Sequence, residues 1–133
     1  MSGYFDDMWV RTSDIRSDEF QNLEGSPKKT EANPMLGMHG IRFSLKNPEI
    51  LRAELNAMKR VLESENGSKR GKSIGILTPQ VISLEEVIGL KKIIKEMGFK
   101  NAKVGVMIET PAAVQIIKKI CEEGIDFVSF GTN

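Results

Sequence analysis

The chain has 133 residues, 40% of them hydrophobic, and its 19 basic and 18 acidic residues give a formal net charge of +1. These values are ordinary for one soluble globular domain, and the interspersed charges exclude the basic stripe that nucleic-acid binding needs. The single cysteine excludes an internal disulfide framework and is typical of a reducing compartment. No apolar run approaches the roughly 18 residues of a membrane span, and the N-terminus lacks the pattern of a signal peptide. We therefore expect a cytoplasmic protein with no nucleic-acid and no membrane partner.

The first half of the chain contains a predicted strand, a long polar segment and a predicted helix. Met8–Thr12 favours a short strand because Trp9 and Val10 suit extended backbone. Residues 13–47 carry several glycines and prolines and no sustained period, which indicates a long loop with short helical turns at most. Pro48 then opens a predicted helix that runs to about residue 63. Its apolar stripe consists of Leu51, Leu55, Met58 and Leu62.

The second half alternates three predicted strands with two predicted helices. The strands are the apolar runs 73–77, 104–108 and 127–130, and a polar turn over 66–72 precedes the first of them. One helix begins after the capping box Ser83 and Glu86 and reaches Met97. The other covers 111–123. Glycine follows each helix as a natural stop.

Continuously apolar strands that alternate with amphipathic helices indicate a parallel sheet covered by helices, which is an α/β fold. Two arrangements of the sheet are possible at this point: an open doubly wound sheet and part of a (β/α)₈ barrel. A full barrel needs about 250 residues, so this sequence would supply roughly half of one.

Polar residues follow two successive strands, which predicts a functional site at the carboxyl edge of the sheet. Glu109 comes directly after the run 104–108, and Thr110 and Pro111 then start a helix as its N-cap and first residue. Glu109 is either a metal ligand or general base, or a surface carboxylate that the helix dipole stabilises. The run 127–130 ends similarly, in Gly-Thr-Asn, where the sequence stops and part of the site is expected to be missing.

Three further polar residues are candidates with a structural alternative each. Arg11, at the end of the first strand, either grips a phosphate or carboxylate or forms an ion pair with Asp14 or Asp18. His39, the only histidine, lies between two glycines and is either a site residue or an ordinary polar loop residue. Arg42 is either an anion ligand or a loop anchor. Cys121 falls in a helical apolar stripe, so we expect a small buried hydrophobe there.

Five motifs occur in order along the chain: WVRTSDIRSDEF (9–20), NPMLGMHGIRFSL (33–45), PEILRAELNAMKRV (48–61), GVMIETPAA (105–113) and DFVSFGTN (126–133). Together they closely resemble the phosphoenolpyruvate/pyruvate-binding barrel of the phosphoenolpyruvate-utilising enzymes. That family includes phosphoenolpyruvate synthase, pyruvate phosphate dikinase and enzyme I of the sugar phosphotransferase system, and the first motif is most similar to the synthase. The resemblance covers nearly the whole chain and implies a partial (β/α)₈ barrel. Residues 1–133 would then form a single partial domain with about strands three to six.

The resemblance also implies roles for individual residues. Arg11 would bind the phosphate of phosphoenolpyruvate, Glu109 would be a Mg²⁺ ligand, and Asn133 would contact the substrate. Many members carry an arginine where this chain has His39, so that His39 and the nearby Arg42 are candidate substrate-binding residues. The family's second Mg²⁺ carboxylate and its enolate-protonating cysteine are not in this sequence. We therefore expect no catalytic residue in this fragment, and no turnover by the fragment alone.

The resemblance implies that the full-length parent converts ATP, pyruvate and water to AMP, phosphoenolpyruvate and phosphate through a phosphohistidine on another domain. The implied partners are that domain, an ATP-binding domain and a second copy in a homo-oligomer. Mg²⁺ suits this chemistry because it prefers hard oxygen ligands. Two alternatives stay open: a fragment of enzyme I or of pyruvate phosphate dikinase, and a non-catalytic half-barrel that serves as an assembly module.

Overall fold

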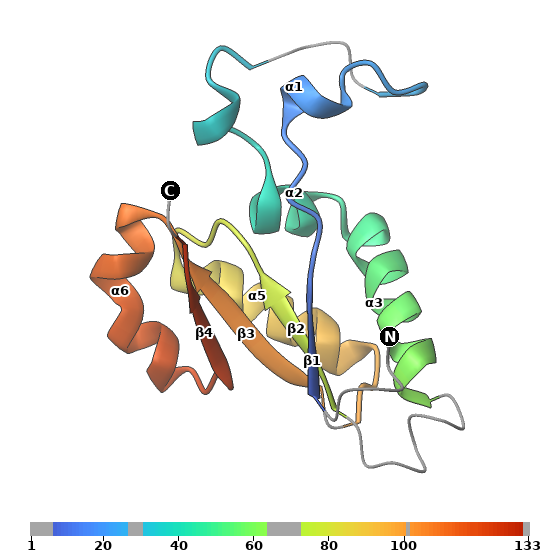
Figure 1. Cartoon of the computed structure of the whole chain (residues 1–133), viewed down its shortest axis with the longest axis vertical. Coiled ribbons are helices and arrows are strands. Elements are labelled where there is room, and N and C mark those ends of the chain that lie inside the picture. Colours follow the sequence, from blue (N-terminus) through green and yellow to red (C-terminus); the bar gives the residue numbers. More distant parts are fainter. Residues whose placement is uncertain (1–6, 27–30, 64–72, 101, 132–133) are drawn as a thin grey trace.

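The computed structural model describes residues 7–26, 31–63, 73–100 and 102–131. Its sheet contains four parallel strands that are neighbours in chain order (Figure 1): β1 (Asp7–Arg11), β2 (Ser73–Thr78), β3 (Lys103–Ile108) and β4 (Phe127–Phe130). A doubly wound sheet reverses its strand order at a switch point, whereas a (β/α)₈ barrel keeps it. The sequential order and the curl of the sheet confirm the α/β prediction and decide for a partial barrel.

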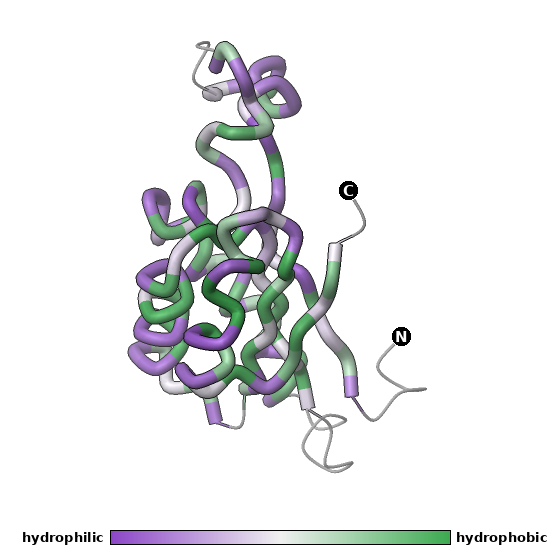
Figure 2. Tube along the Cα trace, turned by 90° about the vertical axis from the view of Figure 1, so that its left-hand side faces the viewer, coloured by the Kyte–Doolittle hydropathy of each residue, from purple (hydrophilic) through white to green (hydrophobic). Residues whose placement is uncertain are grey.

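Three long helices cover one face of the sheet: α3 (Pro48–Glu63), α5 (Leu84–Glu96) and α6 (Pro111–Glu122). Alternate strand residues point toward these helices and are buried, among them Ile76 on β2 and Val106 on β3. Apolar and polar residues alternate along the helices, as the bands of Figure 2 show. The core therefore lies between the sheet and the helices, and each fully buried aliphatic side chain in it contributes about 1.5–3 kcal/mol. Within the described ranges, none of the helices is long and apolar enough to span a bilayer.

On the other, concave face of the sheet, Trp9 packs over glycines of the two central strands. A Cβ added at Gly75 would lie 2.1 Å from the indole, and one added at Gly105 would lie 2.8 Å from it. The indole also stacks on Phe127, with 4.6 Å between the ring centroids. A single side chain from β1 thus covers glycines on β2 and β3 and reaches an aromatic ring on β4.

The segment 13–47 is more helical than the sequence predicted. It contains α1 (Ser17–Phe20), the 3₁₀ helix η1 (Pro34–Leu36) and the seven-residue α2 (Gly40–Lys46). The prediction missed α2 because seven residues are too few to establish a period. The part with α1 and η1 stands above the carboxyl ends of the strands (Figures 1 and 2). The predicted turn over 66–72 lies outside the described residues.

The prediction for Cys121 was wrong, because this side chain is exposed. The buried positions of α6 are Ala113 and Ile120. Cys121 lies one residue beyond Ile120, about 100° further around the helix, so it turns from the sheet toward solvent.

Lysines of α3 and α5 cap the carboxyl ends of α5 and α6, respectively. Lys59 of α3 donates to the carbonyl of Met97 after α5, at 2.7 Å. Lys91 of α5 donates to the carbonyl of Glu123 after α6 and lies 3.0 Å from its carboxylate. The last carbonyls of a helix lack intrahelical partners and carry partial negative charge, so a cation there is favourable. The same contact therefore recurs in two successive units of the partial barrel.

Candidate functional site

Glu109 lies at the carboxyl tip of β3, where the sequence predicted it. The hydroxyl of Thr110 accepts a hydrogen bond from the Ala113 amide at 3.1 Å and donates one to the carbonyl of Val81 at 2.6 Å. Thr110 is thus the N-cap of α6, with Pro111 at its first turn. This cap fixes the point at which the chain turns from strand to helix, and so it fixes the backbone of Glu109.

The carboxylate of Glu109 is held from one side. Its Oε1 accepts a hydrogen bond from the backbone N–H of Gln80 at 2.8 Å. A Cβ added at Gly131 would lie 2.3 Å from the Cβ of Glu109, so the tip of β4 needs glycine to let this side chain pass. In the described part of the chain, no other hydrogen-bond donor contacts this carboxylate. One of its oxygens therefore remains available to a ligand.

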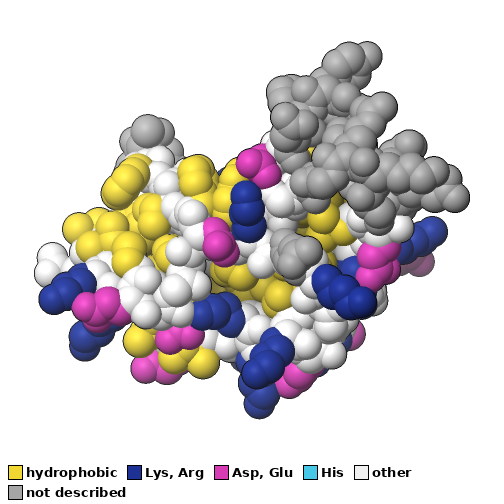
Figure 3. Space-filling view, turned by 90° about the horizontal axis from the view of Figure 1, so that it is seen from below, with side chains coloured by type: hydrophobic (Ala, Val, Ile, Leu, Met, Phe, Trp, Pro, Cys, Tyr) yellow, Lys and Arg dark blue, Asp and Glu magenta, His cyan; other side chains and the backbone are white. Residues whose placement is uncertain are grey.

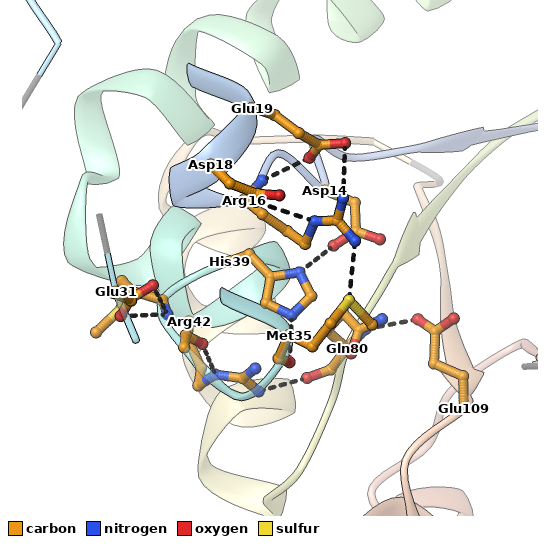
Figure 4. A network of polar contacts seen from close by, with 12 residues as sticks. Asp14, Arg16, Asp18, Glu19, Glu31, Met35, His39, Arg42, Gln80 and Glu109 are labelled. Atoms are coloured by element: carbon orange, nitrogen blue, oxygen red, sulfur yellow. Dashed lines mark hydrogen bonds and ion pairs between the residues drawn. The ribbon is translucent and has the colours of Figure 1, made fainter. Parts of the chain in front are cut away.

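Arg42 joins three segments around the loop that follows β2. Its Nη1 donates to the carbonyl of Gln80 at 2.8 Å and lies 4.0 Å from Glu86, and its Nε donates to the carbonyl of Gly37 at 3.1 Å (Figure 4). These contacts are those of a loop anchor, the structural alternative for this residue. A contact between Arg42 and substrate stays a prediction.

Arg11 is exposed at the end of β1 and forms neither of the ion pairs considered for it. Asp14 instead contacts His39, and Asp18 instead pairs with Arg16 at 3.3 Å. Among the described residues, no acceptor contacts the Arg11 guanidinium. Arg11 lines a polar cavity of about 220 Å³ at the carboxyl edge of the sheet. The other residues that line it are Asp14, Arg16, Glu19, Met35, His39 and Gln80.

His39 is 1% exposed, and both of its ring nitrogens have partners. Nδ1 lies 2.9 Å from a carboxylate oxygen of Asp14, and Nε2 lies 2.9 Å from the carbonyl of Met35 (Figure 4). A carbonyl only accepts, so Nε2 carries the hydrogen there. These contacts tie the end of β1 to the segment before α2. The role of His39 as a substrate ligand stays a prediction, and it would require one of these two bonds to be replaced.

The predicted residues fall into two neighbouring cavities. Arg11 and His39 line the polar one, whereas Arg42 and Glu109 line a larger, mostly apolar one of about 470 Å³. Gln80 and Met35 line both cavities and therefore separate Arg11 from Glu109. Asn133 lies outside the described residues.

The residues at the tip of β3 fit a hard cation in their chemistry, although they form only part of a coordination shell. Within the described ranges, no group of three or more His, Cys, Asp or Glu side chains converges on one point. Mg²⁺ is commonly held by only one or two carboxylates, together with substrate oxygens and waters. The available carboxylate oxygen of Glu109 meets that requirement for one ligand.

Sequence reasoning missed two residues that shape this edge. Gln80 acts through its backbone, and no side-chain pattern signals that. The carboxylate of Glu31 accepts from the Met38 amide at 3.0 and 3.1 Å and from the Ser17 hydroxyl at 3.1 Å. Gly37 lies against it, so that a Cβ there would lie 2.1 Å from this carboxylate and would displace it. Glu31 thus closes the loop that leads to His39.

The opposite, amino edge of the sheet carries ordinary surface pairs. The pKa of Asp7 is lowered because the Ser73 hydroxyl donates to its carboxylate and Lys103 lies 3.2 Å away. Positive and negative side chains are interspersed in the view of this end (Figure 3).

The chain belongs to the phosphoenolpyruvate-utilising enzymes, since residues 4–133 match the phosphoenolpyruvate-binding domain of that family. It is 45% identical to the phosphoenolpyruvate synthase of Pyrococcus furiosus over 130 residues, which is 95% of this chain and 15% of that protein. A probable phosphoenolpyruvate synthase of Archaeoglobus fulgidus is 43% identical over 95% of the chain and 16% of that protein. A phosphoenolpyruvate-protein phosphotransferase of Buchnera aphidicola (from Acyrthosiphon pisum) is 40% identical over 93% of the chain and 22% of that protein. The chain thus spans less than a quarter of these relatives, and the family expected from the motifs is confirmed.

Proposed function

We propose that the chain is part of the phosphoenolpyruvate/pyruvate-binding barrel of a phosphoenolpyruvate synthase, in which Arg11 binds phosphate and Glu109 holds Mg²⁺. The observation that carries the proposal is that both side chains keep hydrogen-bonding groups available to a ligand. Among the described residues, no acidic side chain pairs with the exposed Arg11, and a single donor, the Gln80 N–H, contacts the carboxylate of Glu109. Both residues lie at the carboxyl edge of the sheet. Chemistry in barrels of this kind takes place at that edge.

Charge explains how each residue would act. A guanidinium can donate two parallel hydrogen bonds to a phosphate, and Arg11 has no ion pair with another described residue that it would have to break first. When bound, Mg²⁺ would neutralise negative charge on the enolate and carboxylate oxygens of the three-carbon unit. Glu109 would hold it through a carboxylate that Gln80 already orients. These groups lower the barrier by positioning and electrostatics, as is general in phosphoryl transfer.

In the full-length parent, this site would serve the conversion of ATP, pyruvate and water to AMP, phosphoenolpyruvate and phosphate. The phosphoryl group would arrive from a phosphohistidine on a separate domain, after transfer from an ATP-binding domain. We further propose a cytoplasmic homo-oligomer. The similarity to synthases of several archaea supports this assignment.

A second candidate is the corresponding part of a phosphoenolpyruvate-protein phosphotransferase. The 40% identity to the Buchnera protein supports it. The two candidates share the substrate site and differ in what lies elsewhere in the parent. ATP-dependent formation of phosphoenolpyruvate by the parent would decide for the synthase, and phosphoryl transfer from phosphoenolpyruvate to a carrier protein would decide for the phosphotransferase.

The site itself can be tested on the chain by titrating phosphoenolpyruvate with Mg²⁺ and following backbone amide resonances. We expect shifts concentrated at the ends of β1 and β3. Arg11→Met and Glu109→Gln should each remove most of them, whereas Arg52→Met should not, because Arg52 pairs with Glu96 on the outer helices. Equal shifts in all four proteins would contradict the proposal.

A further inference from the structure

We propose that Arg42 is a positioning residue that sets the orientation of Glu109 through the backbone of Gln80. The inference rests on the proposed function of Glu109 as a cation ligand. Figure 4 shows the connection: the guanidinium of Arg42 contacts the carbonyl of Gln80, and the N–H of Gln80 contacts Glu109. Each contact is 2.8 Å long.

The backbone of Gln80 has an unusual conformation. Its φ of 60° lies in the left-handed region, and among the described residues it is the one non-glycine with a positive φ. Side chains other than glycine seldom adopt this region, and when they do so at a site the surrounding structure holds them there. The conformation therefore requires an explanation in the contacts around Gln80.

The start of α2 supplies those contacts. The amide of Ile41 donates to the carbonyl of Pro79 at 3.3 Å, and Arg42 donates to the next carbonyl, that of Gln80. Gly40 makes the approach possible, because a Cβ there would lie 2.7 Å from the Cβ of Gln80. Two consecutive donors on α2 thus hold two consecutive carbonyls of the loop after β2.

Arg42 is itself held in place. Its Nε donates to the carbonyl of Gly37, and its side chain is 17% exposed beside Glu86. Two of the three guanidinium nitrogens of Arg42 therefore donate hydrogen bonds to backbone carbonyls. This arrangement fixes the carbonyl of Gln80 more firmly than an exposed arginine would. The contact from Ile41 fixes the carbonyl of Pro79, which shares a peptide unit with the Gln80 N–H.

The consequence falls on Glu109. The N–H of Gln80 occupies Oε1 and limits rotation of the carboxylate, so that the second oxygen is presented in one direction. Removing a group that hydrogen-bonds directly to a metal ligand typically weakens metal binding 10- to 100-fold, and here that group is the Gln80 N–H. We therefore expect the affinity of Glu109 for a divalent cation to depend on Arg42, although Arg42 does not contact Glu109.

The test uses ¹⁵N-labelled chain and Mn²⁺ as the probe. Two quantities are measured: the proton shift of the Gln80 amide without metal, and the Mn²⁺ concentration that half-broadens amides next to Glu109. Arg42→Met should move the Gln80 amide upfield and raise that concentration by up to about tenfold, the lower end of the range for a direct partner, because Arg42 acts through Gln80. Arg42→Lys should change both quantities less than Arg42→Met does, because lysine can still donate to the Gln80 carbonyl. The control Arg52→Met should change neither quantity.

A double variant excludes a general loss of structure. Glycine adopts positive φ without support and keeps the N–H. In a Gln80→Gly background, Arg42→Met should therefore weaken Mn²⁺ binding much less than it does alone. An equal loss in both backgrounds would overturn the inference, as would an Arg42→Met protein whose Gln80 amide and Mn²⁺ response match those of the wild type.

Failure of the proposed function would look different. In that case Glu109→Gln would leave the Mn²⁺ response unchanged, or the wild-type chain would show none near Glu109. The Gln80 amide shift in Arg42→Met would still report whether Arg42 holds the loop.

Discussion

The indole of Trp9 stacks on the ring of Phe127, although these residues lie on the first and last strands of the described sheet. The contact crosses β2 and β3, which expose glycines to the indole at that level. Arg11 lies two residues beyond Trp9 on β1 and therefore on the same face of the strand. The aromatic pair thus packs on the concave face directly beneath the carboxyl edge of the sheet, where the candidate site lies.

The first prediction concerns the packing of the Trp9 indole on this face. Gly75→Ala should destabilise the chain by about 1–3 kcal/mol, because the new Cβ would lie 2.1 Å from the indole and displace it. Urea unfolding followed by far-UV circular dichroism measures the change in both backgrounds, since Trp9 is the only tryptophan in the sequence. In a Trp9→Ala background the same substitution should cost much less. A similar cost in both backgrounds would mean that the strain arises elsewhere than at the indole.

The second prediction concerns the repeated lysine caps. Lys91→Met should destabilise the chain by about 0.5–1.5 kcal/mol, since it removes a hydrogen bond to the last carbonyls of α6 and keeps the aliphatic stem. Lys92→Met is the matched control, because Lys92 is exposed on the same helix. Equal midpoints of thermal unfolding for the two variants would show that the cap contributes nothing measurable.

The helices and strands of the second half were predicted to within one or two residues because each carries several local signals at once. Ser83 and Glu86 form the predicted capping box of α5, and Thr110 caps α6. The order of the strands could not be predicted from these local signals, because a βαβ unit has the same sequence pattern in an open sheet and in a barrel. The motifs therefore carried the prediction of a barrel, and the pairing of the strands confirmed it.

The candidate site could be predicted only where a side chain acts at a strand tip. Glu109 follows an apolar run, and its position at the carboxyl edge is visible in the sequence. The support from Gln80 is not, since it depends on a backbone angle and on contacts with α2 nearly forty residues earlier. The burial of His39 also escaped prediction, because a histidine between two glycines reads as an exposed loop residue.

The third prediction tests Glu109 in a full-length parent. Glu109→Gln keeps the size of the side chain and removes the charge that would hold Mg²⁺, so activity should fall severely while the fold persists. Activity is measured at saturating Mg²⁺, with circular dichroism as the check on folding. A loss within about threefold, roughly 0.7 kcal/mol of barrier, would exclude Glu109 as the metal ligand.

The last prediction concerns association of the chain. In the described sheet β1 pairs only with β2, and β4 pairs only with β3, so that two strand edges are open. Phe130 on β4 is 70% exposed and Phe127 is 40% exposed. Open edges with apolar side chains favour pairing with another chain, and monomers seldom expose large apolar patches. We therefore expect a dimer or larger species that dissociates on dilution, measured by sedimentation velocity over a range of concentrations.

A charged residue on β4 should distinguish association through the open strand edge from nonspecific association through other apolar surface. Phe130→Lys should weaken association, because charge blunts an open strand edge. Val114→Lys should leave it unchanged, because Val114 is 55% exposed on the outer face of α6. A wild-type chain that stays a compact, cooperatively unfolding monomer at every concentration would show that its edges are covered within one copy. Equal weakening by both substitutions would place the contact away from β4.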